Sequence, residues 1–348
     1  MQTRLDDIAF VGGELIPNTV PAATEVATRL KDADALLAVH LSFGSGEPLL
    51  RLVEAGLPSA VFSQPFSGHD WMYVPRWQQA GKRVILAASS DYGDLERAVA
   101  LLRVPVRMRQ SRVIVVGSAR GTAPACSPEQ VRRQLGPEVI PISQERILSA
   151  YKAVDPSAAE AEAKEYWIGQ AKKIVEPSRA DIVNSARMYL AVRRIMIEER
   201  AQAMTSSHCM GEPAKGCLTF SKLNDLGLEG PCEGDMDSTL TMLLFAHAFG
   251  VPGFITHPLF DTSTNAVIYA HSTYTTRLYG LTRPPAPFPS PTHSDRHPPV
   301  VFEVMMSPGR RIPSASSRRR RLRGASQAGA ATTAAGGACS HPARSQNR

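Results

Sequence analysis

Residues 35–64, ALLAVHLSFGSGEPLLRLVEAGLPSAVFSQ, contain the pattern that decides the fold. The runs at 35–40 and 60–62 are short and apolar, which indicates strands buried on both faces. Between them, residues 48–55 carry leucine and valine at helical spacing. Strand, helix and strand in this order predict two parallel strands joined by a right-handed crossover.

The same alternation continues toward the C-terminus. Apolar runs recur at 84–88 (VILAA) and 113–117 (VIVVG), and helix-spaced segments lie at 73–80 and 94–102. We therefore expect an N-terminal Rossmann-like parallel-sheet α/β domain over residues 1–145.

A helical hinge is predicted over residues 146–204, followed by a second α/β domain over residues 205–309. The hinge consists of two long helices, at 157–175 and from 178 to about 203, with Pro177 placed where a first turn tolerates proline. The second domain is expected to contain a helix at 237–249 and strands at 251–255, 266–270 and 300–306.

The positive charge of the chain is concentrated at its C-terminal end. The 348 residues include 39 Lys+Arg and 32 Asp+Glu, a net charge of +7, but residues 310–348 hold nine arginines, no lysine and no acid. Residues 1–309 therefore keep 30 basic and 32 acidic groups, a net charge of −2. This balance argues against a body that binds nucleic acid.

Residues 310–348 are predicted to be a disordered tail rich in Arg, Ala, Ser and Gly, because they carry almost no large apolar side chain. Two origins stay open for this tail. A reading-frame change in the gene would explain the abrupt loss of pattern after Gly309. Alternatively, the tail is a nucleic-acid-binding or targeting segment with RRRRLR as its core.

Composition favours a cytoplasmic protein without membrane contact. Hydrophobic residues make up 43% of the chain, but no run approaches the roughly 18 consecutive apolar residues that a membrane span needs. The N-terminus lacks the basic and apolar regions of a secretory signal. The five cysteines include no CxxC pair, which fits reduced thiols better than a disulfide framework.

Three carboxylates precede the helix predicted at 237–249. They are Glu233, Asp235 and Asp237. Acids at this place commonly cap a helix and offset its dipole. In the alternative interpretation, one of them leaves the capping role and points into a pocket as a metal ligand or base.

Asp261 and His271 follow the next two predicted strands. Because Asp261 comes after the run at 251–255, it would lie beyond the carboxyl end of a strand, where α/β proteins bind ligands. An Asx-type turn around Asp261 and Asn265 is the structural alternative. His271 ends the run at 266–270 and is either a ligand or an ordinary hydrogen-bonded histidine.

Glu233, Asp261 and His271 together form an oxygen-rich set with one imidazole. Such a set suits Mn²⁺ or a similar divalent ion better than a closed structural zinc site, which would need regularly spaced thiolates. The sequence contains no HExxH, GxSxG or Walker A motif and no GxGxxG after a strand.

The segments CLTFSKLNDLGLEGPCEGDMDSTLTMLLF and PLFDTSTNAVIYAHSTYTT, within residues 217–280, resemble the L-fucose/L-arabinose isomerase-like family, and more closely its poorly characterised bacterial members. PFSGHDWM at residues 65–72 is similar to the N-terminal part of the same proteins. The resemblance covers roughly residues 30–306. Family members carry a further histidine ligand late in the chain, and neither His293 nor His297 falls in a motif that matches it.

This resemblance implies a metal-dependent aldose–ketose isomerase that uses Mn²⁺, works on an open-chain sugar through an enediol, and forms a homo-oligomer. By the same resemblance, Glu233 and Asp261 would bind the metal and act as the acid–base pair. His271 would ligate the metal or bind a sugar oxygen, and Asp235 and Asn265 would contact the substrate.

Two other functions remain open for the same residues. One is a non-catalytic sugar-binding protein with this fold and a broken metal site. The other is a metal-dependent hydrolase or lyase that uses the Glu, Asp and His set on a different substrate.

Overall fold

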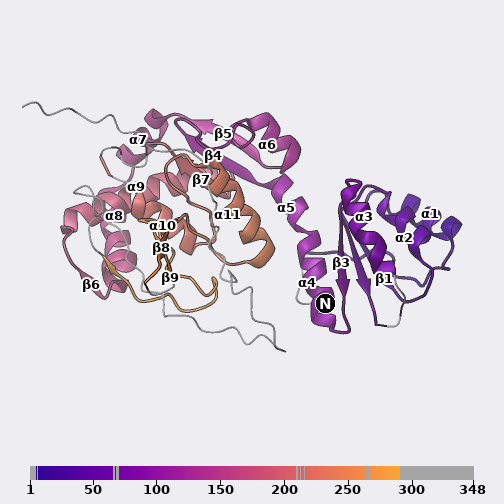
Figure 1. The fold of residues 1–348 in the computed structure, drawn as a ribbon. Helices are drawn as coiled ribbons and strands as arrows, with labels where there is room; N and C mark the ends of the chain where they lie inside the picture. The colour runs from indigo at the N-terminus through magenta and orange to yellow at the C-terminus, as the bar shows by residue number, and fades with distance from the viewer. Residues whose placement is uncertain are drawn as a thin grey trace, which may run out of the picture. The chain divides into compact units, whose positions relative to one another are not determined.

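The computed structural model describes residues 5–290, except 6, 66, 68, 69, 209, 210, 212, 215, 264 and 265. The chain divides into two compact units, residues 1–110 and 111–348 (Figure 1). Each unit is an α/β structure in its own right, so each is described by itself.

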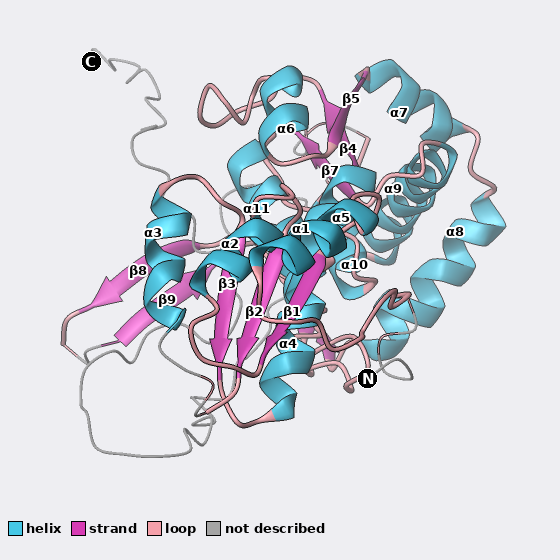
Figure 2. Ribbon diagram, turned by 90° about the vertical axis from the view of Figure 1, so that its right-hand side faces the viewer, coloured by secondary structure: helices cyan, strands magenta, loops and turns pink. Residues whose placement is uncertain are grey.

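The first unit is built around a three-stranded parallel sheet in the order β1-β2-β3 (Figure 2). Its strands alternate with helices along the chain, which is the crossover pattern that parallel pairing requires. The elements are α1 (Val20–Arg29), β1 (Leu36–His40), α2 (Gly46–Val53), β2 (Ser59–Ser63), a 3₁₀ turn (Asp70–Tyr73), α3 (Val74–Gln79), β3 (Val84–Ala88), α4 (Tyr92–Leu102) and α5 (Val104–Gln110).

Helices cover both faces of this sheet. On β2, Val61 packs with side chains of α1, α2 and α3, whereas Ala60 and Phe62 pack with side chains of α4. Successive side chains of a strand point to opposite faces, so a strand covered on both faces needs apolar side chains on both. This explains the apolar middle of β2, residues 60–62, which is flanked by the buried serines Ser59 and Ser63.

The second unit contains a parallel sheet in the order β5-β4-β7, an antiparallel hairpin of β8 and β9, and a short parallel pair of β6 and β10. Its elements are β4 (Arg112–Val116), α6 (Pro128–Gln134), β5 (Glu138–Ile142), α7 (Gln144–Lys152), α8 (Pro156–Glu162), a π-helical segment (Ala163–Ile168), β6 (Lys173–Ile174), α9 (Arg179–Glu198), β7 (Ala203–Ser206), α10 (Cys217–Asp225), α11 (Met236–Phe249), β8 (His257–Asp261), β9 (Ala266–Ala270) and β10 (Pro289–Ser290).

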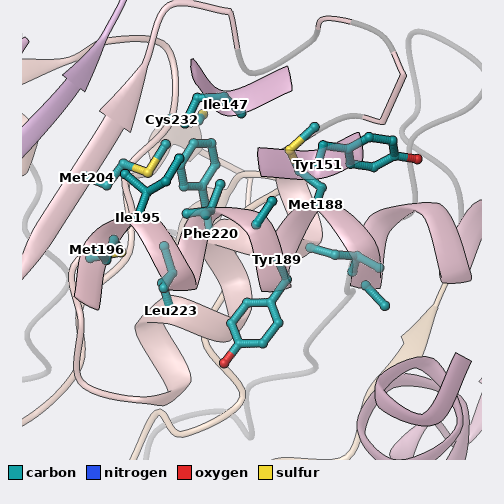
Figure 3. Close-up of a cluster of buried hydrophobic side chains, with 14 of the residues drawn as sticks. Ile147, Tyr151, Met188, Tyr189, Ile195, Met196, Met204, Phe220, Leu223 and Cys232 are labelled. Atoms are coloured by element: carbon teal, nitrogen blue, oxygen red, sulfur yellow. The ribbon is translucent and has the colours of Figure 1, made fainter. Parts of the chain in front are cut away.

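The core of the second unit lies between the β5-β4-β7 sheet and helices α7, α9 and α10. Figure 3 shows part of this cluster. Alternate residues of β4, Ile114 and Val116, contribute to it. Figure 3 shows aromatic, aliphatic and sulfur-containing side chains in this cluster: Ile147, Tyr151, Met188, Tyr189, Ile195, Met196, Met204, Phe220, Leu223 and Cys232. Cys232 is therefore part of the core and directly precedes the polar residue Glu233.

The predicted α/β class is confirmed, but the chain divides earlier than the expected boundary at residue 145. Strands β4 and β5 pair with each other and with β7, which comes after α9, so they belong to the second unit. Residues 146–204 are accordingly not a separate hinge: α7 and α9 supply much of that unit's core.

Two predicted helices end sooner than expected. The helix expected at 157–175 is α8 followed by a π-helical segment that ends at Ile168. The helix expected from 178 to 203 begins with a capping box between Ser178 and Asp181 and stops at Glu198. Arg200 then takes a left-handed conformation with φ of 51°, which ends a helix and releases Ala203–Ser206 to form β7.

The strand expected at 251–255 lies further along the chain. Residues 251–256 are described but form no strand, and β8 starts at His257. Pro252 cannot donate to a ladder and glycine weakens one, so the segment that contains them is a poor strand. The predicted strand at 300–306 and the tail at 310–348 lie outside the described residues.

No helix within the described ranges is both long enough and apolar enough to cross a membrane.

Candidate metal centre

The turn at Glu233 and Gly234 has an unusual backbone conformation. Both residues are left-handed, with φ of 69° and 74°. For glutamate this conformation costs about 1–2 kcal/mol, and the turn is clamped from outside because the Arg120 N–H donates to the Gly234 carbonyl at 2.8 Å. A side chain at position 234 would place its Cβ 2.6 Å from the Ser118 carbonyl oxygen, so glycine is required there. The fold thus holds Glu233 in a strained and defined position.

Two histidines approach this turn from the β8–β9 hairpin. His257 is the first residue of β8 and pairs with Ala270, so it lies across the hairpin from His271. The two ring centroids are 5.2 Å apart. His271 Nδ1 lies 3.1 Å from Thr273 Oγ1, which orients the ring.

Cys232, Glu233 and His271 offer ligand atoms that all lie within 4.8 Å of one another. His271 Nε2 is 3.5 Å from Cys232 Sγ and 3.9 Å from Glu233 Oε1. A thiolate, an imidazole and a carboxylate at such spacing are donors that a divalent transition metal accepts. A hydrogen-bond partner on the other ring nitrogen fixes the orientation of a metal-binding histidine, and the Thr273 hydroxyl supplies such a partner for His271. This group of three could therefore hold a metal ion.

The Glu233 carboxyl favours its ionised form and is accessible to solvent. The neighbouring His271 imidazole lowers the pKa of the Glu233 carboxyl, burial opposes that shift, and electrostatic interactions with His257 and Arg120 add to the lowering. The Glu233 side chain is 49% exposed, whereas that of His271 is 5% exposed. A charged carboxylate at the open side of the cluster can contact a ligand from solvent, while the buried imidazole stays fixed.

The cluster lies at the carboxyl end of the β5-β4-β7 sheet. Thr205 of β7 donates its hydroxyl to the Cys232 carbonyl at 3.3 Å. Ser207, just past β7, would be only 3.2 Å from a Cβ at Gly234. Open α/β sheets bind ligands at this edge because the loops that follow the strands converge there.

A small cavity opens at the same edge. Its volume is about 40 Å³, and its polar lining includes Gln144, Ser206, His208 and Thr219. This is room for roughly two or three water-sized groups. The Thr219 hydroxyl is buried and has no hydrogen-bond partner in the described part of the chain, so the cavity offers a polar group that a bound molecule would satisfy.

The structure brings together two of the predicted ligands, Glu233 and His271, and leaves Asp261 out of their cluster. Asp261 ends β8 and accepts hydrogen bonds from the Ser263 N–H at 3.0 Å and the Ser263 hydroxyl at 2.6 Å. It forms the Asx-type turn that was the structural alternative. Because β8 starts six residues later than the strand expected at 251–255, His257 stands beside His271 instead.

Asp235 is the N-cap of α11. Its carboxylate accepts from the Ser238 N–H at 2.9 Å and from the Ser238 hydroxyl at 2.6 Å. Capping therefore occupies the oxygens that were expected to face a substrate. Asn265 lies outside the described residues.

Neither Cys232 nor His257 stood out in the sequence as a candidate ligand. Cys232 was visible as the neighbour of Glu233, but no second cysteine at metal-ligand spacing marked it. His257 was hidden because its partner is set by the pairing register of β8 and β9.

Glu229, also missed, is a buried acid three residues before Cys232. Its backbone extends the sheet edge, because the Met204 N–H donates to its carbonyl at 2.9 Å. Its side chain is fully buried, and among the described residues no hydrogen bond of ordinary geometry reaches either carboxyl oxygen, although the Gly253 backbone lies close enough to act on the carboxyl. Burial raises the pKa of Glu229 to about 8, against a smaller lowering by the Gly253 backbone. At neutral pH this carboxyl is therefore mostly protonated.

No protein-family model and no curated protein matches this chain.

Proposed function

We propose that Glu233, His257 and His271, with Cys232 beside them, form the metal centre of a sugar isomerase that interconverts an aldose and a ketose. One observation carries the proposal: a strained, half-exposed carboxylate lies against a buried imidazole and a thiol at the carboxyl edge of a parallel sheet. Strained residues cluster at functional sites. The likeness of residues 217–280 to L-fucose/L-arabinose isomerase-like proteins supports this choice of reaction.

Glu233 is the proposed proton acceptor. Its pKa is lowered chiefly by His271, so it is a carboxylate at neutral pH, and its exposed side would face a substrate that enters from solvent. It would take the proton from the carbon next to the sugar carbonyl, which gives an enediol, and the proton would return to the adjacent carbon. A bound divalent ion would polarise the two sugar oxygens. His271 would keep its fixed position through Thr273.

The donor set decides which ions fit. Mn²⁺ is the ion that the resemblance implies, and one carboxylate with two imidazoles would accept it. The thiol of Cys232, 3.5 Å from His271 Nε2, shifts the preference toward Zn²⁺ or Fe²⁺, because soft thiolates select such ions.

The same thiol favours a second candidate function. With Zn²⁺ bound by Cys232 and the two histidines, the site would suit a hydrolase or lyase in which Glu233 activates water. Product analysis separates the two candidates, because an isomerase leaves the composition of its substrate unchanged.

The metal content of the purified protein tests the centre. We expect about one divalent transition-metal ion per chain by mass spectrometry, and its loss in Glu233→Gln and in His271→Gln. Asp261→Asn is the matched control, because its carboxylate lies in the hairpin turn, and it should keep the ion. A parent protein that holds no ion after incubation with Mn²⁺ and Zn²⁺ would refute the centre.

Proton exchange tests the reaction. In D₂O, an isomerase places deuterium from solvent at the carbon next to the carbonyl of its sugar, which NMR detects directly. A panel of aldoses should show this exchange with the parent and none with Glu233→Gln. Exchange that persists in Glu233→Gln would remove Glu233 from its proposed role.

A further inference from the structure

We propose that Arg120 binds an anionic group of the substrate, so that the substrate is a sugar that carries a phosphate or a carboxylate. This inference rests on the proposed function and names the class of sugar that the same site accepts. Arg120 lies in the loop that follows β4, and its backbone is joined to the turn that presents Glu233.

The position of Arg120 is fixed by two backbone hydrogen bonds. Its N–H donates to the Gly234 carbonyl at 2.8 Å, and its carbonyl accepts from the Met236 N–H at 2.9 Å. It thus forms a parallel bridge opposite Asp235, two residues past Glu233. These backbone contacts place Arg120 directly beside the turn that presents Glu233, and its positive charge adds to the lowering of the pKa of Glu233.

The side chain of Arg120 is exposed, and within the described ranges its guanidinium makes no hydrogen bond or ion pair. Other arginines of the second unit do pair with carboxylates. Arg112 contacts Glu138 and Glu199. Arg146 contacts Glu198 and Glu199. An arginine without a partner beside a candidate site has its full set of donors free for a ligand.

The two aspartates nearest to Arg120 along the turn are occupied elsewhere. Asp235 accepts from Ser238, and Asp237 accepts from the Thr122 N–H at 2.6 Å and the Thr122 hydroxyl at 2.8 Å. Their oxygens hold the start of α11 and the loop after β4, so they do not neutralise Arg120 by direct contact. A planar guanidinium pairs bidentately with phosphate or carboxylate. Either anion on a substrate would therefore give Arg120 the partner that it lacks among the described residues.

The opposing explanation is that Arg120 only offsets the negative charge of Glu233. In that case Arg120 would affect metal binding and would not distinguish a charged sugar from a neutral one. A comparison of matched ligands on the metal-loaded protein separates the two explanations.

The test measures binding of sorbitol, sorbitol 6-phosphate and gluconate to the full chain loaded with Mn²⁺ or Zn²⁺, by calorimetry. We expect one of the two anions to bind at least tenfold more tightly than sorbitol, and the better one identifies the anionic group. Arg120→Gln should weaken that ligand by roughly 10- to 100-fold, the usual effect of losing a charged hydrogen bond. Sorbitol affinity and metal content should stay unchanged.

Two variants serve as controls. Arg120→Lys keeps the charge without the planar fork and should recover part of the lost affinity. Arg133→Gln removes an exposed arginine of α6 and should bind all three ligands as the parent does.

Equal affinity of the loaded parent for all three ligands would overturn the inference and leave the metal centre standing. Arg120→Gln with undiminished anion affinity would overturn it as well. If the parent takes up no metal, or binds no polyol when loaded, the proposed function itself fails, and metal analysis shows which of these has occurred.

Discussion

Replacement of Glu229 by glutamine should make the second unit more stable, and more so as pH rises. Glu229 is fully buried, and among the described residues no hydrogen bond of ordinary geometry reaches its carboxyl, which has only the Gly253 backbone acting on it as a weak stabiliser of the charged form. Burial raises its pKa from 4.5 to about 8 in the folded protein. The folded state therefore keeps a proton that the unfolded chain releases above pH 4.5, and the protein loses stability as pH rises through this window.

The size of the effect follows from the two pKa values. One pKa unit corresponds to about 1.36 kcal/mol. Integrated from pH 5 to pH 8, a shift from 4.5 to about 8 removes about 3.5 kcal/mol from the free energy of unfolding. Glutamine is neutral at every pH and has nearly the shape of a protonated glutamate. The variant and the parent should thus be similar at pH 5, and the variant should be about 3.5 kcal/mol more stable than the parent at pH 8.

Urea-dependent amide exchange in α9 (Arg179–Glu198), followed by mass spectrometry, reports on the second unit alone. The quantity of interest is the difference in unfolding free energy between parent and Glu229→Gln at pH 5 and at pH 8. This double difference cancels every other titrating group. Glu198, an exposed acid on α9, offers a control in Glu198→Gln, which should show no gain in stability at pH 8.

A difference that stays constant within about 0.5 kcal/mol between pH 5 and pH 8 would refute the reasoning, because it would mean that Glu229 titrates alike in both states. A variant that is less stable at pH 8 than at pH 5, relative to the parent, would show that the carboxylate is satisfied when charged.

Three further substitutions test the packing around the site by urea unfolding. Asp225→Asn should lower the free energy of unfolding by about 3 kcal/mol or more, because Asp225 is buried and accepts five hydrogen bonds; a loss under 1 kcal/mol would contradict this. Gly234→Ala should cost about 2–4 kcal/mol and lower the metal content, because its Cβ would meet the Ser118 carbonyl at 2.6 Å; unchanged metal content would count against the turn's role. Lys222→Met should lower the free energy of unfolding by about 3 kcal/mol or more, because it leaves the mostly buried Glu162 carboxylate without its partner and removes the cation–π contact with Tyr166; a loss under about 1 kcal/mol would contradict this.

Much of the α/β architecture was readable from local pattern. Short apolar runs identified strands such as β2, whose middle residues 60–62 are apolar because helices cover both faces of the sheet there. Strand β7 was missed because Ala203–Ser206 is a short, weakly apolar segment. It becomes a strand through pairing with β4, and such pairing is a non-local interaction that local propensity does not encode.

By itself the sequence determined the α/β class, the apolar strands of the first unit, and Glu233 and His271 as residues able to bind a metal. The tertiary structure decided which side chains join them. His257 meets His271 only through the register of the β8–β9 hairpin, and a shift of strand position turned Asp261 into a turn residue. Arg120 reaches the site through backbone hydrogen bonds to a turn more than 110 residues away. These contacts between residues far apart in the sequence depend on strand register and loop closure, which are properties of the folded chain and not of any one segment.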